Sequence, residues 1–228
     1  RLEGLYRKGL DNAGTTILAS RAVLVGPNTV RLTATDELVT AERILIAVGG
    51  HPTPHADLPG HALCISSNEA FDLPTLPKSI LIAGGGYIAV EFANIFHGLG
   101  VETTLIYRGK QILSRFDQDM RQGVQAAMVA KGIRILCEDI ITSVSEAEGG
   151  GRIATTKAGE TLAVDQVMLA LGRVPNTGSL GLETAGVAMD ERGAILVDAY
   201  SRTNVPGIFA LGDVTDRVQL TPVAIHEA

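Results

Sequence analysis

The chain has 228 residues, of which 46% are apolar and 19% charged, a composition typical of a folded globular protein rather than a disordered one. Its 19 Lys and Arg against 25 Asp and Glu give a formal charge of -6, so it has no long-range attraction for nucleic acid or for an anionic membrane. No run of 18 apolar residues occurs, and the first ten residues lack the apolar segment of a secretory signal. We therefore expect a cytoplasmic protein that binds neither nucleic acid nor membrane.

The two cysteines, Cys64 and Cys137, are far apart in the sequence and form no C-x-x-C motif. This spacing indicates neither a disulfide framework nor a zinc site. We expect no metal and predict that both cysteines are reduced packing residues.

Both ends of the sequence are unusual for a complete protein. It begins at Arg1 without a Met, and it closes on an apolar-periodic stretch at 220–228 with no stop signal after it. We expect the chain to be an interior piece of a longer protein.

The first fifty residues predict β structure. Residues 29–34 alternate polar and apolar side chains, and the apolar run at 44–48 predicts a buried strand. The sequence GGHP at 49–52 then ends this strand, and a domain boundary is predicted there.

The middle of the chain predicts a βαβ unit, with a strand at 79–83, a glycine turn, a helix and a second strand at 103–107. Another helix is predicted over 117–131, because apolar residues follow at i, i+4, i+7 and i+8 and Gly132 stands where a C-terminal glycine belongs. Residues 133–136 resume a strand, and 140–169 predict three short strands joined by turns at 149–151 and 157–160. The predicted fold class is α/β.

The glycine turn at 84–89, GGGYIA, has the spacing G-x-G-x-x-A between a buried strand and a helix. Gly84 permits the tight turn, Gly86 lets a pyrophosphate approach backbone N–H groups, and Ala89 lets the helix pack close to the strand. The N-terminus of the helix then attracts phosphates. The alternative is a strand-to-helix turn in an unrelated fold.

The end of the second strand indicates which nucleotide binds. An NAD site has Asp or Glu there, whereas this chain has Tyr107 followed by Arg108. A guanidinium suits a 2′-phosphate, and Lys110 and Arg115 are close enough to add positive charge. The sequence therefore favours NADPH over NADH, and the alternative for Arg108 is an ordinary surface charge.

Two further turns follow apolar strands. ALGRVPN at 170–176 is similar to AVGGHP at 47–52, and both stand at presumed domain crossings. TNVPGIFALGDV at 203–214 places Gly212 and Asp213 at the end of a strand, where the carboxylate can accept a hydrogen bond from a sugar-like hydroxyl. The alternative is an Asp that caps a turn.

In this order and spacing, GGGYIAVE, ALGRVPN and TNVPGIFALGDV resemble the FAD-dependent pyridine nucleotide–disulfide oxidoreductases over nearly the whole chain. LTPVA at 220–224 is similar to glutathione reductases and their trypanothione-reducing relatives. The resemblance implies an NADPH-binding Rossmann-like domain at 51–176, inserted into part of an FAD-binding Rossmann-like domain made by 1–50 and 177–228. It implies a homodimer in which NADPH reduces FAD, FAD reduces an active-site disulfide, and that dithiol reduces glutathione disulfide.

The resemblance also implies roles for single residues. Tyr87 would cover the flavin until nicotinamide displaces it, and Glu91 would lie near the nicotinamide amide, paired with a lysine outside this chain because a buried, unpaired carboxylate is costly. Asp213 would bind the ribityl hydroxyl of FAD, and Thr221 would begin a helix whose positive end faces the flavin. The other implied cofactor-binding residues are Ala22, near the end of a strand-like stretch, and Gly49, Gly84, Gly85, Gly86, Ile88, Arg108, Arg115, Gly172, Gly212, Gln219 and Leu220.

The chain departs from the family pattern in two respects. The order SRFD at 114–117 shifts Arg115 by one position, which leaves its phosphate contact open. The family's first FAD glycine loop, its Cys-x4-Cys pair and its C-terminal His-Glu pair have no counterpart, and His226 is interpreted as an ordinary helix residue. The alternatives are a nucleotide-binding fragment without turnover, or a relative acting on trypanothione, mercuric ion or dihydrolipoamide. The sequence LTPVA at 220–224 argues against dihydrolipoamide as the substrate.

Overall fold

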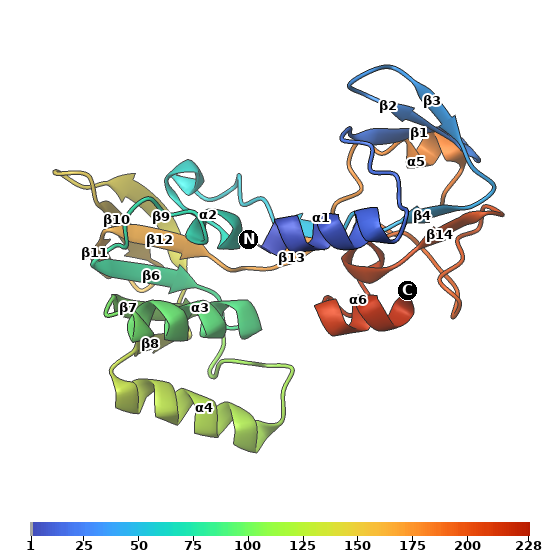
Figure 1. The fold of residues 1–228 in the computed structure, drawn as a ribbon. Helices are drawn as coiled ribbons and strands as arrows, with labels where there is room; N and C mark the ends of the chain where they lie inside the picture. Colours follow the sequence, from blue (N-terminus) through green and yellow to red (C-terminus); the bar gives the residue numbers. More distant parts are fainter. Residues whose placement is uncertain (1) are drawn as a thin grey trace. The chain divides into compact units, whose positions relative to one another are not determined.

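The computed structural model describes residues 2–228, which divide into two compact units. Unit 1 combines Arg1–His51 with Val174–Ala228, and unit 2 is Pro52–Arg173. In Figure 1, unit 1 carries the blue segments and the darker orange to red ones, whereas unit 2 runs from cyan through green and yellow to the light orange of β12. The chain passes between the units at β5 (Gly50–Pro52) and β13 (Arg173–Pro175).

Unit 2 is built on a parallel four-stranded sheet with the order β12-β6-β7-β8. These strands are β6 (Ser79–Ala83), β7 (Glu102–Tyr107), β8 (Arg134–Cys137) and β12 (Gln166–Leu169), and α3 (Tyr87–Gly98) connects β6 to β7. Ile80 and Ile82 of β6 pack in the same core as Ala93 of α3, whereas Leu81 points into a second core with Val144. The apolar run of β6 is therefore buried on both faces, as expected for a central parallel strand.

The helix predicted over 117–131 is α4 (Gln118–Lys131). Its N-cap is Asp117, whose side chain accepts hydrogen bonds from the backbone N–H groups of Asp119 and Met120. Gly132 ends the helix with a left-handed φ of 104°, which a glycine adopts without strain.

The segment at 140–169 forms four strands rather than the three predicted. β9 (Ile141–Glu146), β10 (Arg152–Thr156) and β11 (Thr161–Val164) make an antiparallel meander, and β12 leaves it to join β6. Asp165 separates β11 from β12, because its carboxylate accepts hydrogen bonds from the backbone N–H groups of Lys78 (2.7 Å) and Ser79 (3.2 Å). The remaining elements of unit 2 are η1 (His61–Leu63) and α2 (Ser67–Ala70).

Unit 1 contains an antiparallel sheet and a parallel strand pair, and β5 and β13 pair with each other where the chain passes between the units. β1 (Ala22–Gly26), β2 (Thr29–Leu32) and β3 (Leu38–Thr40) form an antiparallel sheet, and β4 (Ile44–Ile46) pairs in parallel with β14 (Ile208–Ala210). Its helical segments are α1 (Leu2–Asn12), α5 (Leu182–Ala185), η2 (Gly212–Thr215) and α6 (Thr221–Glu227). The core between these elements includes Leu24, Ile46, Leu182, Ile208 and Val214.

The run at 44–48 is not buried throughout, which corrects the sequence prediction. Ile46 is buried and belongs to the unit 1 core, whereas Leu45 is 55% exposed and Val48 is 40% exposed. Within residues 2–228, core residues cover only the face of β4 that carries Ile46, so its apolar sequence does not produce two buried faces.

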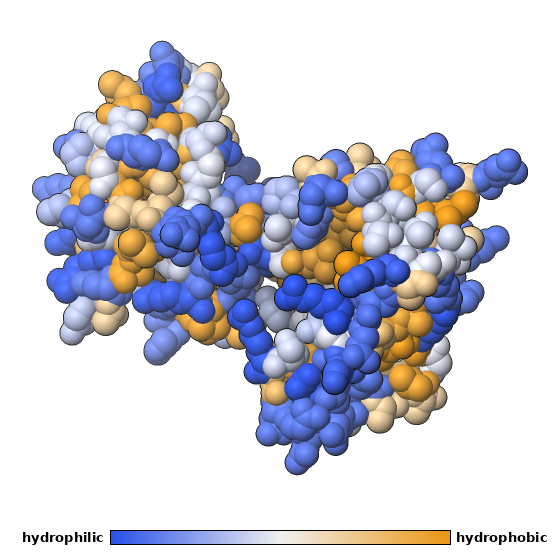
Figure 2. Space-filling view, turned by 180° about the vertical axis from the view of Figure 1, so that it is seen from behind, coloured by the Kyte–Doolittle hydropathy of each residue, from blue (hydrophilic) through white to orange (hydrophobic). Residues whose placement is uncertain are grey.

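The surface carries small groups of apolar side chains among polar ones (Figure 2). Figure 2 shows one face, on which apolar residues are spread between polar residues; Phe71 and Tyr200 are the most exposed of the large apolar side chains described. Among residues 2–228, no helix is both long and apolar enough to cross a membrane.

Candidate functional site

Three predicted nucleotide-binding segments follow neighbouring strands of the unit 2 sheet. The glycine turn follows β6, Arg108 follows β7, and the segment ending in Gly172 follows β12. Because the strands are parallel, with Ala83 beside both Leu169 and Ile106, all three segments leave the sheet at the same edge. The chain runs from β6 through β7 to β8 in one direction, and β12 lies on the other side of β6. This edge is therefore a topological switch point, where open α/β sheets bind ligands.

The glycine turn has the tight geometry that its sequence predicts. Gly84 has a φ of 141°, and its N–H donates to the carbonyl oxygen of Ile106 at 2.9 Å. A Cβ at Gly84 would overlap the carbonyl oxygen of Ala170 and lie 3.2 Å from Cβ of Ala89. Helix α3 and the segment after β12 thus both approach this turn too closely for a side chain. At Gly85, a Cβ would instead overlap the Tyr107 ring.

Gly86 is different, because the space beside it is open. It is the N-cap of α3, with a φ of -82°, and no described side chain caps this end of the helix. Apart from its chain neighbours, no described atom lies within 4 Å of a Cβ placed on Gly86. The N–H groups at the start of α3 therefore face room for a phosphate, so this site fits a dinucleotide.

Three cations follow β7. Arg108, Lys110 and Arg115 are exposed, and none of them forms an ion pair with another residue in the described part of the chain. Their loop is tied to the glycine turn, since the N–H of Leu113 donates to the carbonyl oxygen of Gly85 at 2.6 Å. Positive charge is therefore carried by a loop with a fixed connection to the turn.

Sequence reasoning missed two residues that shape this loop. Leu113 is buried and adopts a left-handed φ of 56°, a conformation for which a leucine gives no sequence signal. Arg121 of α4 donates from Nε to the carbonyl oxygen of Ile112 and from NH2 to that of Gln111, each at 3.0 Å. A long-range contact between a helix and a loop has no periodicity that could have revealed it.

Helix α3 presents the predicted nicotinamide-side residues in its first two turns. Tyr87 and Ile88 are half-buried, and Glu91, one turn after Tyr87, is exposed. The expected partner of Glu91 is a lysine outside this chain, so that pairing stays a prediction.

The predicted flavin-side residues follow the two parallel strands of unit 1. Gly49 follows β4, and Gly212 and Asp213 follow β14, so both segments leave the same edge. The N–H of Leu211 donates to the carbonyl oxygen of Ile46 at 3.2 Å, which holds the second segment beside the first. Asp213 is half-buried in η2, and a Cβ at Gly50 would lie 3.4 Å from its Cβ.

Helix α6 packs on η2. It begins at Thr221, as predicted, after the exposed Leu220, and no described side chain caps it. A Cβ at Gly212 would lie 3.2 Å from Cβ of Ala224, so α6 approaches the Gly-Asp turn closely. Gln219 donates from Nε2 to a carboxylate oxygen of Asp216 at 2.7 Å, at the end of η2.

The placement of Ala22 corrects the sequence prediction. Ala22 begins β1 instead of standing near the end of a strand, and it pairs with Leu32 in the antiparallel sheet. It therefore lies in a different sheet from β4 and β14, whose carboxyl edge carries the other residues predicted on the flavin side.

Cys64 and Cys137 are free cysteines and half-buried, as predicted for reduced packing residues. Burial raises the pKa of the Cys64 thiol to about 11, although the charge of Arg152 opposes the shift. Burial and the charge of Glu138 also raise the pKa of Cys137. Both side chains therefore remain thiols near neutral pH. His226 is an exposed residue of α6.

The whole sequence, residues 1–228, matches the pyridine nucleotide-disulphide oxidoreductase family. The chain belongs to this family. It is 46% identical to a glutathione reductase of Burkholderia cepacia over 227 residues, which are 100% of this chain and 50% of that protein. It is 47% identical to a trypanothione reductase of Trypanosoma congolense over 194 residues, or 84% of this chain and 39% of that protein.

The fold of this oxidoreductase chain is that of solved flavoprotein disulfide reductases. An HOCl-induced flavoprotein disulfide reductase, RclA, from Escherichia coli aligns with a TM-score of 0.91 and 28% identity, over 99% of this chain and 52% of that one. The α/β class and the family resemblance are thus confirmed. The chain spans 50% and 39% of the lengths of the two curated relatives named above, and the roles of its single residues stay predictions.

Proposed function

We propose that the complete protein is an NADPH-dependent flavoprotein disulfide reductase that reduces glutathione disulfide, as a cytoplasmic homodimer with FAD and an active-site disulfide. The observation that carries this proposal is the edge of the unit 2 sheet, where an open glycine turn and unpaired cations follow neighbouring strands. Identity of 42–46% to glutathione reductases over the whole chain supports the substrate.

In this proposal, 51–176 is the NADPH-binding domain. The N–H groups after Gly86 bind the pyrophosphate, Arg108 pairs with the 2′-phosphate, and Gly172 lies against the nucleotide. Arg115 adds charge from the same loop. Tyr87 shields the flavin until nicotinamide arrives, and Ile88 and Glu91 line the nicotinamide side.

Residues 1–50 and 177–228 would form part of the FAD-binding domain. FAD, when bound, supplies the redox chemistry between the nicotinamide and the disulfide. Asp213 accepts a hydrogen bond from a ribityl hydroxyl, while Gly49 and Gly212 let the cofactor approach the backbone. Gln219, Leu220 and the start of α6 at Thr221 lie on the flavin side. Ala22 would contact the cofactor by its backbone, from the other sheet of unit 1.

The coenzyme assignment is tested by Arg108→Ala in the complete protein. Removing the guanidinium takes away a charge-assisted contact with the 2′-phosphate and nothing that NADH uses, so kcat/KM for NADPH should fall at least about tenfold while that for NADH changes less than about twofold. Lys131→Ala is the matched control, since this exposed cation ends α4 and precedes β8, at the opposite edge of the sheet. Equal losses with both coenzymes would remove Arg108 from the phosphate site.

Trypanothione disulfide is the second candidate substrate, because of the 47% identity to a trypanothione reductase. The two disulfides differ in charge, so comparing kcat/KM for glutathione disulfide and trypanothione disulfide in the complete protein separates them. A preference for trypanothione would overturn the proposed substrate while leaving the coenzyme assignment intact.

A further inference from the structure

Glu227, in the last turn of α6, joins this helix to the turn that carries Asp213. Its Oε2 accepts a hydrogen bond from the backbone N–H of Gly212 at 3.0 Å. The Glu227 side chain is only 17% exposed, and a carboxylate acceptor makes a stronger hydrogen bond than a neutral one. The N–H of Gly212, the residue before Asp213, is therefore held from the side by α6.

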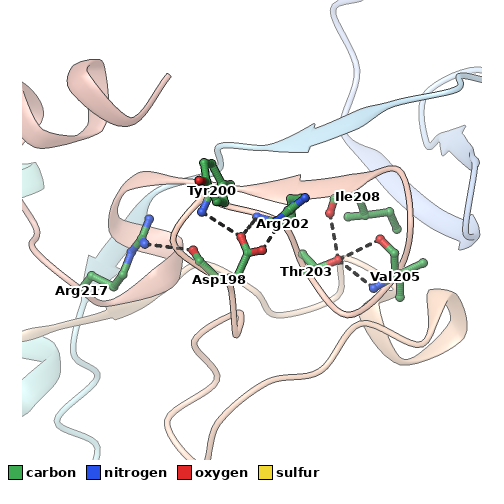
Figure 3. Close-up of polar contacts among 7 residues, drawn as sticks. All are labelled: Asp198, Tyr200, Arg202, Thr203, Val205, Ile208 and Arg217. Atoms are coloured by element: carbon green, nitrogen blue, oxygen red, sulfur yellow. Dashed lines mark hydrogen bonds and ion pairs between the residues drawn. The ribbon is translucent and has the colours of Figure 1, made fainter.

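The other carboxylate oxygen of Glu227 pairs with Arg217. Oε1 lies 2.9 Å from NH2 of Arg217, and the same NH2 donates to Oγ of Ser201 at 3.2 Å. NH1 of Arg217 points to the carbonyl oxygen of Asp198 at 3.5 Å, as Figure 3 shows. Glu227 is thus bonded on one side to Gly212 and on the other to a cation that the 198–201 turn also holds.

The 198–201 turn is itself well fixed. The Asp198 carboxylate accepts hydrogen bonds from the N–H groups of Tyr200 (2.8 Å) and Arg202 (3.0 Å), and from Nε of Arg202 at 2.8 Å (Figure 3). These bonds hold the pKa of Asp198 below its usual range, and the bond from the Arg202 backbone N–H has the largest effect. The turn therefore gives Arg217 a stable anchor.

We propose that Glu227 is a positioning residue for FAD. Its carboxylate holds the N–H of Gly212, and so the start of the η2 turn that carries Asp213, in one arrangement before the cofactor binds. Such preorganisation raises the affinity for FAD, because the conformational entropy of the turn is already lost before FAD binds. This inference rests on the proposed function, in which Asp213 contacts the ribityl chain.

The test measures FAD affinity of the complete protein, by titrating the flavin-free form with FAD and following fluorescence quenching. Glu227→Ala should weaken binding about tenfold, whereas Glu227→Gln, which keeps an acceptor oxygen for Gly212, should remain within about threefold of the parent. Glu160→Ala is the matched control. It removes a carboxylate from an ion pair with Arg134 in unit 2, and it should leave FAD affinity unchanged.

A double-mutant cycle separates positioning from a merely structural role. If Glu227 acts through Asp213, Glu227→Ala should raise the Kd for FAD by less than about twofold when Asp213 is already replaced by alanine. The proposal is overturned if Glu227→Ala binds FAD as the parent does. It is also overturned if Glu227→Ala weakens FAD binding tenfold both in the parent and in Asp213→Ala. Normal FAD affinity of Asp213→Ala alone would instead refute the proposed role of Asp213.

If Glu227→Ala fails to fold, a variant that removes only Arg217 tests the proposal instead. Arg217→Ala leaves the carboxylate in place but takes away its second partner, so FAD affinity should fall about threefold and Asp213→Ala should abolish that difference. An unchanged affinity of Arg217→Ala would then overturn the proposal.

Discussion

Gly86→Ala is expected to separate coenzyme binding from folding. Gly86 has a φ of -82° and a ψ of 178°, which any residue adopts, and a new Cβ would meet no described atom beyond its chain neighbours within 4 Å. Replacing glycine stabilises by about 0.4–1 kcal/mol through the unfolded chain, and alanine is less favourable than glycine at an N-cap by about 0.5–1 kcal/mol. These effects offset each other, so the free energy of unfolding should change by less than about 1 kcal/mol.

The same methyl group should interfere with NADPH. It would occupy the open space before the N-terminus of α3, where the pyrophosphate has to approach the backbone. We expect the Kd for NADPH, measured by calorimetry, to rise at least about tenfold, which corresponds to about 1.4 kcal/mol. Thermal unfolding of the same preparation should show a shift of no more than a few degrees.

Gly84→Ala is the matched variant, and it should behave in the opposite way. Its φ of 141° strains any L side chain by about 1–3 kcal/mol, and the overlap with the carbonyl oxygen of Ala170 forces a shift that costs about 1–3 kcal/mol more. The variant should therefore lose roughly 2–6 kcal/mol of stability. NADPH binding of Gly86→Ala within twofold of the parent, or equal stability of the two variants, would refute the reasoning.

Two further predictions concern unit 2. Burial raises the pKa of Cys64 to about 11. At pH 8, Cys64 should therefore react at least about tenfold more slowly with an aromatic disulfide reagent than an exposed thiol does, because the smaller thiolate fraction outweighs the higher nucleophilicity of the thiolate. The rate should rise until about pH 11, and Cys64→Ser should abolish this phase. Arg121→Ala should lower the free energy of unfolding in urea by about 1–3 kcal/mol, because the carbonyl oxygens of Gln111 and Ile112 lose a charged donor. Arg134→Ala, which breaks an exposed ion pair, should lower it by less than about 1 kcal/mol.

The sequence predicted those elements whose signals are local. The strand, glycine turn, helix and strand at 79–107 were correct, because hydrophobic periodicity and the glycine spacing lie within that segment. The break between β11 and β12 was missed. It depends on Asp165, whose partners Lys78 and Ser79 are 87 and 86 residues away in the sequence.

In the candidate site, too, local signals were predicted and long-range contacts were missed. The positions of Gly84 and Arg108 after parallel strands followed from the sequence, because the βαβ pattern itself places them at one edge. The hydrogen bonds from Arg121 to the 111–112 backbone did not, since a contact between a helix and a loop depends on the tertiary fold. The contacts of Glu227 with Gly212 and Arg217 could not be predicted either. Neither residue stands three or four positions from Glu227, the spacing at which side chains meet on one helix.

The glycines of unit 2 do not all carry the same information about function. Gly84 and Gly172 follow β6 and β12 with φ values of 141° and 121°, so the path of the backbone alone requires a glycine at each position. A turn with the same backbone path would need these glycines whatever its function. Gly86 is not required by its backbone angles or by the described neighbours. What its missing side chain provides is access to the N–H groups of α3, and this access, rather than the glycine-rich turn as a whole, is the feature that points to a bound pyrophosphate.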